Sequence, residues 1–161
     1  MGRSGEENKR NFMKNWQFIE GAKIGETLGS KVYDGKHQLE PLSALSKEKG
    51  ISFNILEDHN FLEGQPEAHR HEADLWIGIE GEMKFVVGGE MVEAYAKEGN
   101  DNEIKAKTIA NGTEVVVKAG DVLLIPAGIP HAHTAVHGRA AVIKIPERDI
   151  VPLEEVPGWR R

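Results

Sequence analysis

Short apolar runs separated by turn-forming residues dominate the chain from residue 51 onward. The runs are rich in valine, isoleucine and aromatic residues, and glycine, asparagine, aspartate or proline bounds each of them. This pattern is typical of β-strands joined by tight turns. We expect strands within the ranges 51–57, 74–81, 83–89, 90–96, 103–110, 113–120, 121–128, 131–138 and 140–146.

Two dipeptides between apolar runs resemble the turns of β-hairpins. Gly88-Gly89 separates the runs "FVV" and "EMV", and Asn111-Gly112 separates "TIA" from "TEVVV". Such pairs adopt the positive φ angles that two-residue hairpin turns require. We therefore predict a hairpin at each position.

Helical signals are scarce. Only the segment 41–50, "PLSALSKEKG", has a helical pattern, and it ends at Gly50. Many short strands with little helix indicate an all-β fold, either an antiparallel sandwich or a barrel. The polar segment 96–103 is predicted to be a loop that interrupts the series of strands.

The domain organisation follows from the same pattern. A chain of 161 residues is expected to form one domain. We expect a disordered polar leader at 1–12 and an extension of short strands and turns at 13–50. The β-barrel occupies 51–146, and a proline-containing extended tail follows at 147–161.

Composition excludes several classes of protein. The absence of cysteine excludes disulfides, thiolate catalysis and cysteine-bound metals, so any metal must be bound by histidine nitrogen and carboxylate oxygen. The net charge of −6 comes from interspersed charges without a basic patch, which argues against a nucleic-acid partner. No apolar run reaches the roughly 18 residues that a membrane span needs. We expect a cytoplasmic protein.

Four of the seven histidines form two pairs of the form His-x-His. His69 and His71 form one pair, and His131 and His133 form the other, each at the border of a predicted strand. Residues i and i+2 of a strand point to the same face, so each pair would aim its rings together. Buried imidazoles need partners for their nitrogens, and a divalent first-row metal is one such partner. Exposed histidines bonded to water are the alternative.

The residues around the second pair resemble a motif of the cupin superfamily. That motif has the form Gly-x5-Pro-x-Gly-x2-His-x3-Asn, and "GDVLLIPAGIPHAHTA" matches it. Gly120, Pro126, Gly128 and His131 are in register, whereas Ala135 replaces the final asparagine.

The first histidine pair matches the other cupin motif more loosely, in "GQPEAHRHEADLWIGIEG". Asp74 takes the position of the family's glutamate when the motif is counted back from Gly81. Two residues separate His71 from Asp74, one fewer than the motif has, and Gly64 is also one residue closer to His69. The resemblance implies a cupin-type jelly-roll β-barrel over 51–146.

The resemblance also implies a ligand set for one metal ion. His69, His71 and His131 would be ligands, and Asp74 would be either a fourth ligand or a residue beside the ligands. Iron is the first expectation, with nickel, manganese, zinc or copper as alternatives, because similar nitrogen and oxygen ligands serve all of them.

The candidate catalytic residues are His133 and Trp76. His133 could be a further donor, an acid–base group, or a histidine that supports the ligands through hydrogen bonds. Trp76, which has the parity of Asp74, could line the pocket or belong to the core. Glu72 is expected in a solvated turn and is the substitute ligand if Asp74 points away. The remaining histidines are expected at the surface, namely His37, His59 and His137.

A cupin fold does not determine one function. Three histidines with or without a carboxylate leave open positions on an octahedral metal, which suits a small oxygenated substrate with or without O₂. The first hypothesis is therefore a metal-dependent oxidoreductase of dioxygenase type. The alternatives are a non-catalytic module that binds a small molecule or metal, and a metal-independent isomerase or epimerase. By the same resemblance, we expect a homodimer.

Overall fold

The computed structural model describes residues 15–146 together with Leu153 and Pro157. The predicted leader at 1–12 and almost all of the predicted tail at 147–161 lie outside the described residues. No helix within the described part of the chain is long and apolar enough to cross a membrane.

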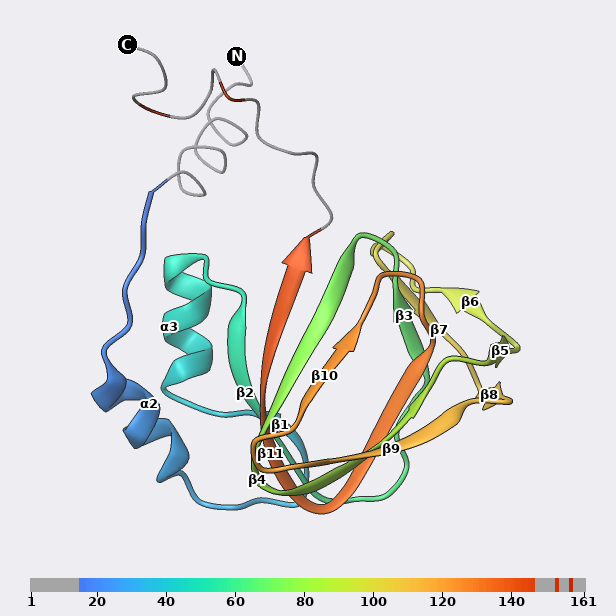
Figure 1. Cartoon of the computed structure of the whole chain (residues 1–161), viewed down its shortest axis with the longest axis horizontal. Helices are drawn as coiled ribbons and strands as arrows, with labels where there is room; N and C mark the ends of the chain where they lie inside the picture. Colours follow the sequence, from blue (N-terminus) through green and yellow to red (C-terminus); the bar gives the residue numbers. More distant parts are fainter. Residues whose placement is uncertain (1–14, 147–152, 154–156, 158–161) are drawn as a thin grey trace.

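Strands dominate the described residues, and the expected all-β fold with little helix is confirmed (Figure 1). The described residues include two short α-helices, α2 before β1 and α3 between β1 and β2. The elements in chain order are α2 Gly21–Leu28, β1 Gly35–Gln38, α3 Leu42–Lys49, β2 Phe53–Phe61, β3 Glu67–His69, β4 Glu72–Val87, β5 Glu90–Val92, β6 Tyr95–Ala96, β7 Glu103–Lys105, β8 Thr108–Ala110, β9 Thr113–Lys118, β10 Val122–Ile125 and β11 His131–Pro146.

Two long strands, β4 and β11, form the centre of the fold. They pair antiparallel along most of their length. At one end β2 and β10 flank this pair, with β1 beyond β2. At the other end β9 lies beside β4, and β3 lies beside β11, followed by β7 and β6. The sheets do not close.

The central pair bends where two glycines lie opposite each other, at Gly81 and Gly138. Gly81 has a φ of +60°, and a Cβ on Gly138 would lie 2.5 Å from Met83 Cγ. The inward-facing parity changes across the bend, from Trp76 before it to Phe85 after it. The sequence predicts that one strand ends and another begins near each of these glycines. The structure instead has one continuous bent strand through each of them, β4 and β11.

The predicted hairpins at Gly88-Gly89 and Asn111-Gly112 are wrong. β4 pairs with β9 before these residues, and β5 pairs with β8 after them, so the two dipeptides interrupt one long antiparallel ladder. Gly88, Gly89 and Asn111 have positive φ angles, as expected. A Cβ on Gly89 would lie 2.2 Å from the carbonyl oxygen of Ala110. The residues therefore provide a close crossing of two strands rather than two turns.

The helix predicted at 41–50 is present as α3, and Gly50 ends it with a φ of +65°. Helix α2 was not predicted. In Figure 1, α3 lies beside β2, and α2 lies next to α3. Their apolar side chains contribute to a small second core that contains Leu39, Leu42 and Ile55. The larger core lies between the two sheets and contains Trp76, Met83, Phe85, Val117, Ile125 and Val142 among others.

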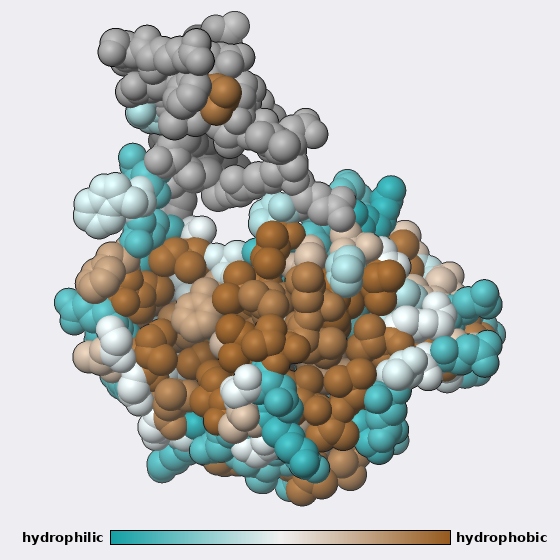
Figure 2. Space-filling model, viewed as in Figure 1, coloured by the Kyte–Doolittle hydropathy of each residue, from teal (hydrophilic) through white to brown (hydrophobic). Residues whose placement is uncertain are grey.

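The outer face of the sheet on the side of β10, away from the helices, carries exposed aliphatic side chains. Figure 2 shows apolar residues gathered over the middle of the view, where β4, β10 and β11 lie in Figure 1. On β10 the exposed fractions of Val122 and Leu124 are 63% and 55%. No described element covers this side of β10.

A buried ion pair connects α2 to the sheet. The Nε of Arg139 on β11 donates to Glu57 Oε2 on β2 at 2.6 Å, and both side chains are almost fully buried. The two terminal nitrogens of Arg139 donate to the carbonyl oxygens of Leu28 and Ser30 at the end of α2. This arginine therefore holds the segment after α2 against the sheet.

We predict that Arg139→Ala lowers the free energy of unfolding by about 3–5 kcal/mol, because it leaves Glu57 charged and buried without its partner. Urea unfolding monitored by circular dichroism measures this difference. Lys84→Ala is the matched control, since the Lys84–Glu114 pair is exposed. The control is expected to change the free energy by at most about 1 kcal/mol. Equal losses in the two variants would contradict this role of Arg139.

Candidate metal centre

Strand pairing brings three candidate ligands together at one end of the molecule. Glu67 on β3 lies directly opposite His131 on β11, so the two side chains are cross-strand neighbours. Glu67 and His69 are two residues apart on β3 and share a face. The backbone N–H of Gly128 donates to the carbonyl oxygen of His69 at 2.7 Å, which ties the turn before His131 to β3.

The ligand atoms of Glu67, His69 and His131 all lie within 4.8 Å of one another. Glu67 Oε1 is 4.0 Å from His69 Nε2 and 3.7 Å from His131 Nε2. All three side chains are largely buried. Two imidazoles and one carboxylate are a donor set that suits a divalent transition metal, and non-haem iron in particular.

Asp74 lies on β4, close to both histidine rings. Its Oδ1 is 3.3 Å from His69 Nδ1, and its Oδ2 is 3.5 Å from His131 Nε2. Lys144, the cross-strand partner of Asp74 on β11, places its Nζ 2.7 Å from Oδ1. The carboxylate therefore faces the nitrogen of His69 that points away from Glu67. A carboxylate in this place fixes the ring so that Nε2 is available to a metal.

One ring nitrogen at this site has no hydrogen-bond partner. His131 Nδ1 lies 3.0 Å from the carbonyl oxygen of Ile129, which can only accept, so Nδ1 carries the proton. In the neutral ring, Nε2 is then an acceptor, and it is buried without a partner. Asp74 Oδ2 faces it and is also buried without a partner. Acceptors that face each other need a cation between them, either a proton or a metal ion.

The electrostatics of the cluster are consistent with a missing cation. Burial alone would lower the pKa of His131, but the carboxylates of Asp74 and Glu67, at 3.5 and 3.7 Å from Nε2, raise it to about 9. Burial alone would raise the pKa values of both acids. Interactions with the histidines and with Lys105 or Lys144 instead hold the pKa of each carboxyl well below its usual range. Both carboxylates are therefore ionised at neutral pH and can bind a metal.

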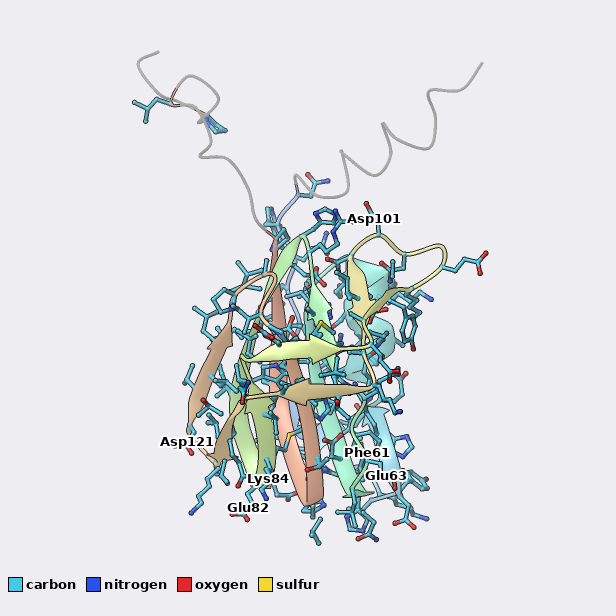
Figure 3. The ribbon with its side chains drawn as sticks, turned by 90° about the vertical axis from the view of Figure 1, so that its right-hand side faces the viewer. Phe61, Glu63, Glu82, Lys84, Asp101 and Asp121 are labelled. Atoms are coloured by element: carbon cyan, nitrogen blue, oxygen red, sulfur yellow. The ribbon has the colours of Figure 1, made fainter. Side chains whose placement is uncertain are left out.

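His71 lies apart from this group. Strand β3 ends at His69, and His71 follows in the turn before β4. Its side chain is 57% exposed, and its Nε2 lies 3.3 Å from Asp101 Oδ2. In Figure 3, Asp101 stands at the upper end of the molecule. The structure thus brings together three of the four predicted ligand residues, His69, Asp74 and His131, and places Glu67 beside them instead of His71.

Glu67 was not predicted from the sequence. Residues 67, 69 and 71 would all share one face in a continuous strand. The alternation of strand residues therefore does not distinguish Glu67 from His71 as a partner of His69. The strand runs back from His69 to Glu67 and not forward to His71. The polar loop at 97–102 holds His71 away from the cluster. The backbone N–H of His71 donates to Asn102 Oδ1, and the His71 ring contacts the carboxylate of Asp101.

The candidate catalytic residues His133 and Trp76 lie side by side in the interior. Their ring centroids are 5.2 Å apart, and Phe85 lies 5.4 Å from His133. The Nδ1 of His133 donates to Asp58 Oδ2 at 2.5 Å, and Asp58 is fully buried. Asp58 thus fixes the tautomer of His133 and leaves Nε2 as the ring nitrogen without the proton.

The other predicted positions are less buried. Glu72, at the start of β4, accepts a hydrogen bond from the side chain of Asn102. Two of the histidines expected at the surface are half-buried and contact each other, with Nδ1 atoms of His59 and His137 3.0 Å apart. His137 also contacts Glu80 on β4.

Two adjoining cavities open beside the ligands. One, of about 350 Å³, is lined by Glu67 and His69 and by the apolar side chains of Trp76, Leu56 and Val142. The other, of about 320 Å³, is lined by Glu67 and His133. It extends to Phe61 and Glu63, which Figure 3 shows at the lower end of the molecule. A small molecule could therefore reach both the cluster and His133.

Comparisons with known proteins give distant likenesses. No family model matches the chain, and no curated protein does. Protein NMB1881 from Neisseria meningitidis gives a TM-score of 0.45 at 12% identity, over 81% of this chain and 100% of that one. Hydroxypropylphosphonic acid epoxidase from S. wedmorenis gives 0.41 at 12% identity, over 58% of this chain. The Co(II) form of HppE with Tris buffer gives 0.44 at 11%, over 73% of this chain and 57% of that one.

The chain covers only 42% of the length of the epoxidase. Likenesses at these scores carry no argument about chemistry, so the candidate site rests on its own geometry.

We predict that the metal-free protein loses stability as the pH rises from about 6.5 to about 9. The pKa of His131 is near 6.5 in an unfolded chain and about 9 in the folded one. Its contribution is therefore complete below pH 6.5 and disappears as the pH passes the folded value, a loss on the order of 3 kcal/mol.

Urea unfolding in the presence of a chelator, at pH 6 and pH 9.5, measures this loss. His131→Gln removes the titrating group, so the difference between wild type and variant isolates its contribution from that of other groups. The same pH dependence in both proteins would show that the carboxylates do not hold a proton on His131.

Proposed function

We propose that this chain is a metal-binding cupin that holds one divalent transition metal between Glu67, His69 and His131. The observation that carries the proposal is the buried Nε2 of His131, which has no hydrogen-bond partner and faces two ionised carboxylates. A metal ion would take the place of the proton that His131 otherwise holds between these carboxylates. Glu67 takes the ligand position that the sequence motif assigns to His71.

Each residue near the ligands has a role in this proposal. Asp74 orients the ring of His69 and is itself held by Lys144. The carbonyl oxygen of Ile129 fixes the tautomer of His131, so that Nε2 offers its lone pair. Residues that orient ligands in this way raise metal affinity, and their removal typically lowers it about 10- to 100-fold.

We further propose that the protein is an oxidoreductase of dioxygenase type that acts on a small oxygenated organic molecule. Bound iron would polarise the substrate's oxygen atoms and exchange electrons with O₂. The chain's own residues would bind and orient the substrate in the two cavities, with Trp76 as an apolar wall. His133, oriented by Asp58, would accept or hold a proton at Nε2.

The buried pair of His133 and Asp58 also favours a second candidate function, a metal-independent isomerase. A histidine oriented by a buried carboxylate can act as a general base without any metal. The two functions differ after chelation, since a metal-independent isomerase keeps its full activity and the proposed oxidoreductase loses it.

We predict that the protein, purified without a histidine tag and reconstituted with iron, nickel or zinc, holds about one metal ion per chain. Elemental mass spectrometry measures the content. His69→Ala, His131→Ala and Glu67→Ala are each expected to lose the metal, because two ligands remain in each. Asp74→Asn is expected to retain a reduced affinity.

His71→Ala is the matched control, since His71 is also a histidine of the His-x-His pair but lies outside the cluster. Its metal content is expected to equal that of wild type. Loss of the metal in His71→Ala with retention in Glu67→Ala would restore the ligand set of the sequence motif. Failure of the wild type to bind any of the three metals would reject the proposal.

A further inference from the structure

Three lysines surround the cavity beside the proposed metal ligands, and each comes from a different strand. Lys36 lies on β1, Lys105 on β7 and Lys144 on β11. Lys36 and Lys105 line both adjoining cavities, together with Glu67. Strands that are distant in sequence thus place ammonium groups around one opening.

Two of these lysines have carboxylate partners. Lys144 Nζ is 2.7 Å from Asp74 Oδ1, and Lys105 Nζ is 2.6 Å from Glu67 Oε2 and 3.5 Å from Glu103 Oε1. Burial alone would lower the pKa of Lys105, but interactions with Glu67 and Glu103 raise it above its ordinary value. These ion pairs hold both ammonium groups beside the cavity.

Lys36 differs, because it has no ion-pair or hydrogen-bond partner among residues 15–146. Its side chain is exposed at the rim, close enough to Glu67 to favour the charged form of that carboxyl. Three acids beside the cavities have lysine partners, whereas Glu63 and Glu72, which also line them, have none among the described residues. Lys144 holds Asp74, Lys105 holds Glu67, and Lys97 with Lys105 holds Glu103. Without a metal, the charged side chains around the two cavities therefore leave no positive excess, and Lys36 is the lysine that no carboxylate binds directly.

A divalent metal bound to Glu67 would create a positive excess. The ion would partly neutralise Glu67, the main partner of Lys105, and would add two positive charges to the cavity. An anionic group between Lys36 and Lys105 would restore the balance. Glu63 lines the second cavity with both lysines, but it is exposed and no ion pair joins it to either of them.

Part of the lining of the first cavity is apolar. Leu56, Trp76 and Val142 line it, and all three are more than nine-tenths buried. Cavities of a few hundred cubic ångströms accept small organic molecules, in which a few polar groups set the orientation. The lining therefore matches a ligand with one acidic end and a short apolar body.

We propose that the substrate is a small organic acid, whose carboxylate or phosphonate is held by Lys36 and Lys105 while its carbon chain lies against Trp76. This inference rests on the proposed function, because it identifies the substrate class of the same site. The acid group would anchor the molecule at the mouth and place its next oxygenated carbon toward Glu67, His69 and His131. Lys36 is then a specificity-determining residue and not a metal ligand.

The test compares binding of three probes to zinc-loaded protein, namely butyrate, propylphosphonate and neutral 1-butanol. Isothermal calorimetry or ligand-observed NMR measures each dissociation constant, with no need for turnover. At least one anion is expected to bind saturably and more tightly than 1-butanol. Lys36→Gln is expected to weaken that binding about tenfold or more, since it removes a charge-assisted hydrogen bond. Lys36→Arg is expected to retain most of it.

Lys107→Gln is the matched control, because Lys107 is an exposed lysine that pairs with Glu93 outside the cavity. It is expected to bind the anion as wild type does. Equal anion affinity in Lys36→Gln and wild type would overturn the inference, as would absence of saturable anion binding or equal binding of 1-butanol. Which anion binds distinguishes a carboxylate from a phosphonate substrate.

Metal content, measured on the same samples, separates this inference from the proposed function. If wild type holds zinc and anion binding does not depend on Lys36, the inference fails and the metal site stands. If wild type holds no zinc and anion binding still falls in Lys36→Gln, the metal proposal fails while the anion site stands.

Discussion

The structure depends on how one buried nitrogen is satisfied. His131 Nε2 lies in the interior with two carboxylates nearby and no hydrogen donor directed at it. A buried polar group without a partner destabilises a protein by about 1–3 kcal/mol, and a buried ionised carboxylate by more. A proton shared with Asp74 and Glu67 removes this cost in the metal-free protein. A metal ion removes it by offering one cation to all three groups.

The fold supplies this arrangement through two long strands that bend together. Beyond Gly81 and Gly138, β4 and β11 pass from one sheet into the other, so that residues on both sheets face one interior. Glu67 and His131 meet across a strand pair, whereas Asp74 approaches from the opposite sheet. The Arg139–Glu57 pair and the helices stabilise the outer side of the bent strands and leave the end with the histidines open to the cavities.

The β-rich class, most strand positions and helix α3 could be predicted from the sequence, because alternation and turn residues act locally. The bends could not, since Gly81 and Gly138 interrupt the pattern as a turn would, although each strand continues. The glycine pairs at 88–89 and 111–112 have the backbone angles of hairpin turns, but pairing with distant strands decides their role. Helix α2 was not predicted, and it packs against α3, where the side chain of Thr27 accepts the backbone N–H of Leu42.

The site shows the same division. The motif with Gly128 and the alternation of strand residues selected His69, Asp74 and His131, and the structure places these three side chains close together. His71 is displaced because β3 ends at His69 and the loop at 97–102 binds the following turn. Glu67 could be found only from the register of β3 against β11, which no local pattern specifies. The lysines around the cavity are likewise set by the order of strands and not by spacing in the chain.

A crystal structure of the zinc-loaded protein, with anomalous diffraction data collected on both sides of the zinc absorption edge, would test the central claim most directly. We expect a single strong anomalous peak within bonding distance of His69 Nε2, His131 Nε2 and a Glu67 carboxylate oxygen, with His71 still beside Asp101. A peak bound by His71, or no peak between His69 and His131, would contradict the account.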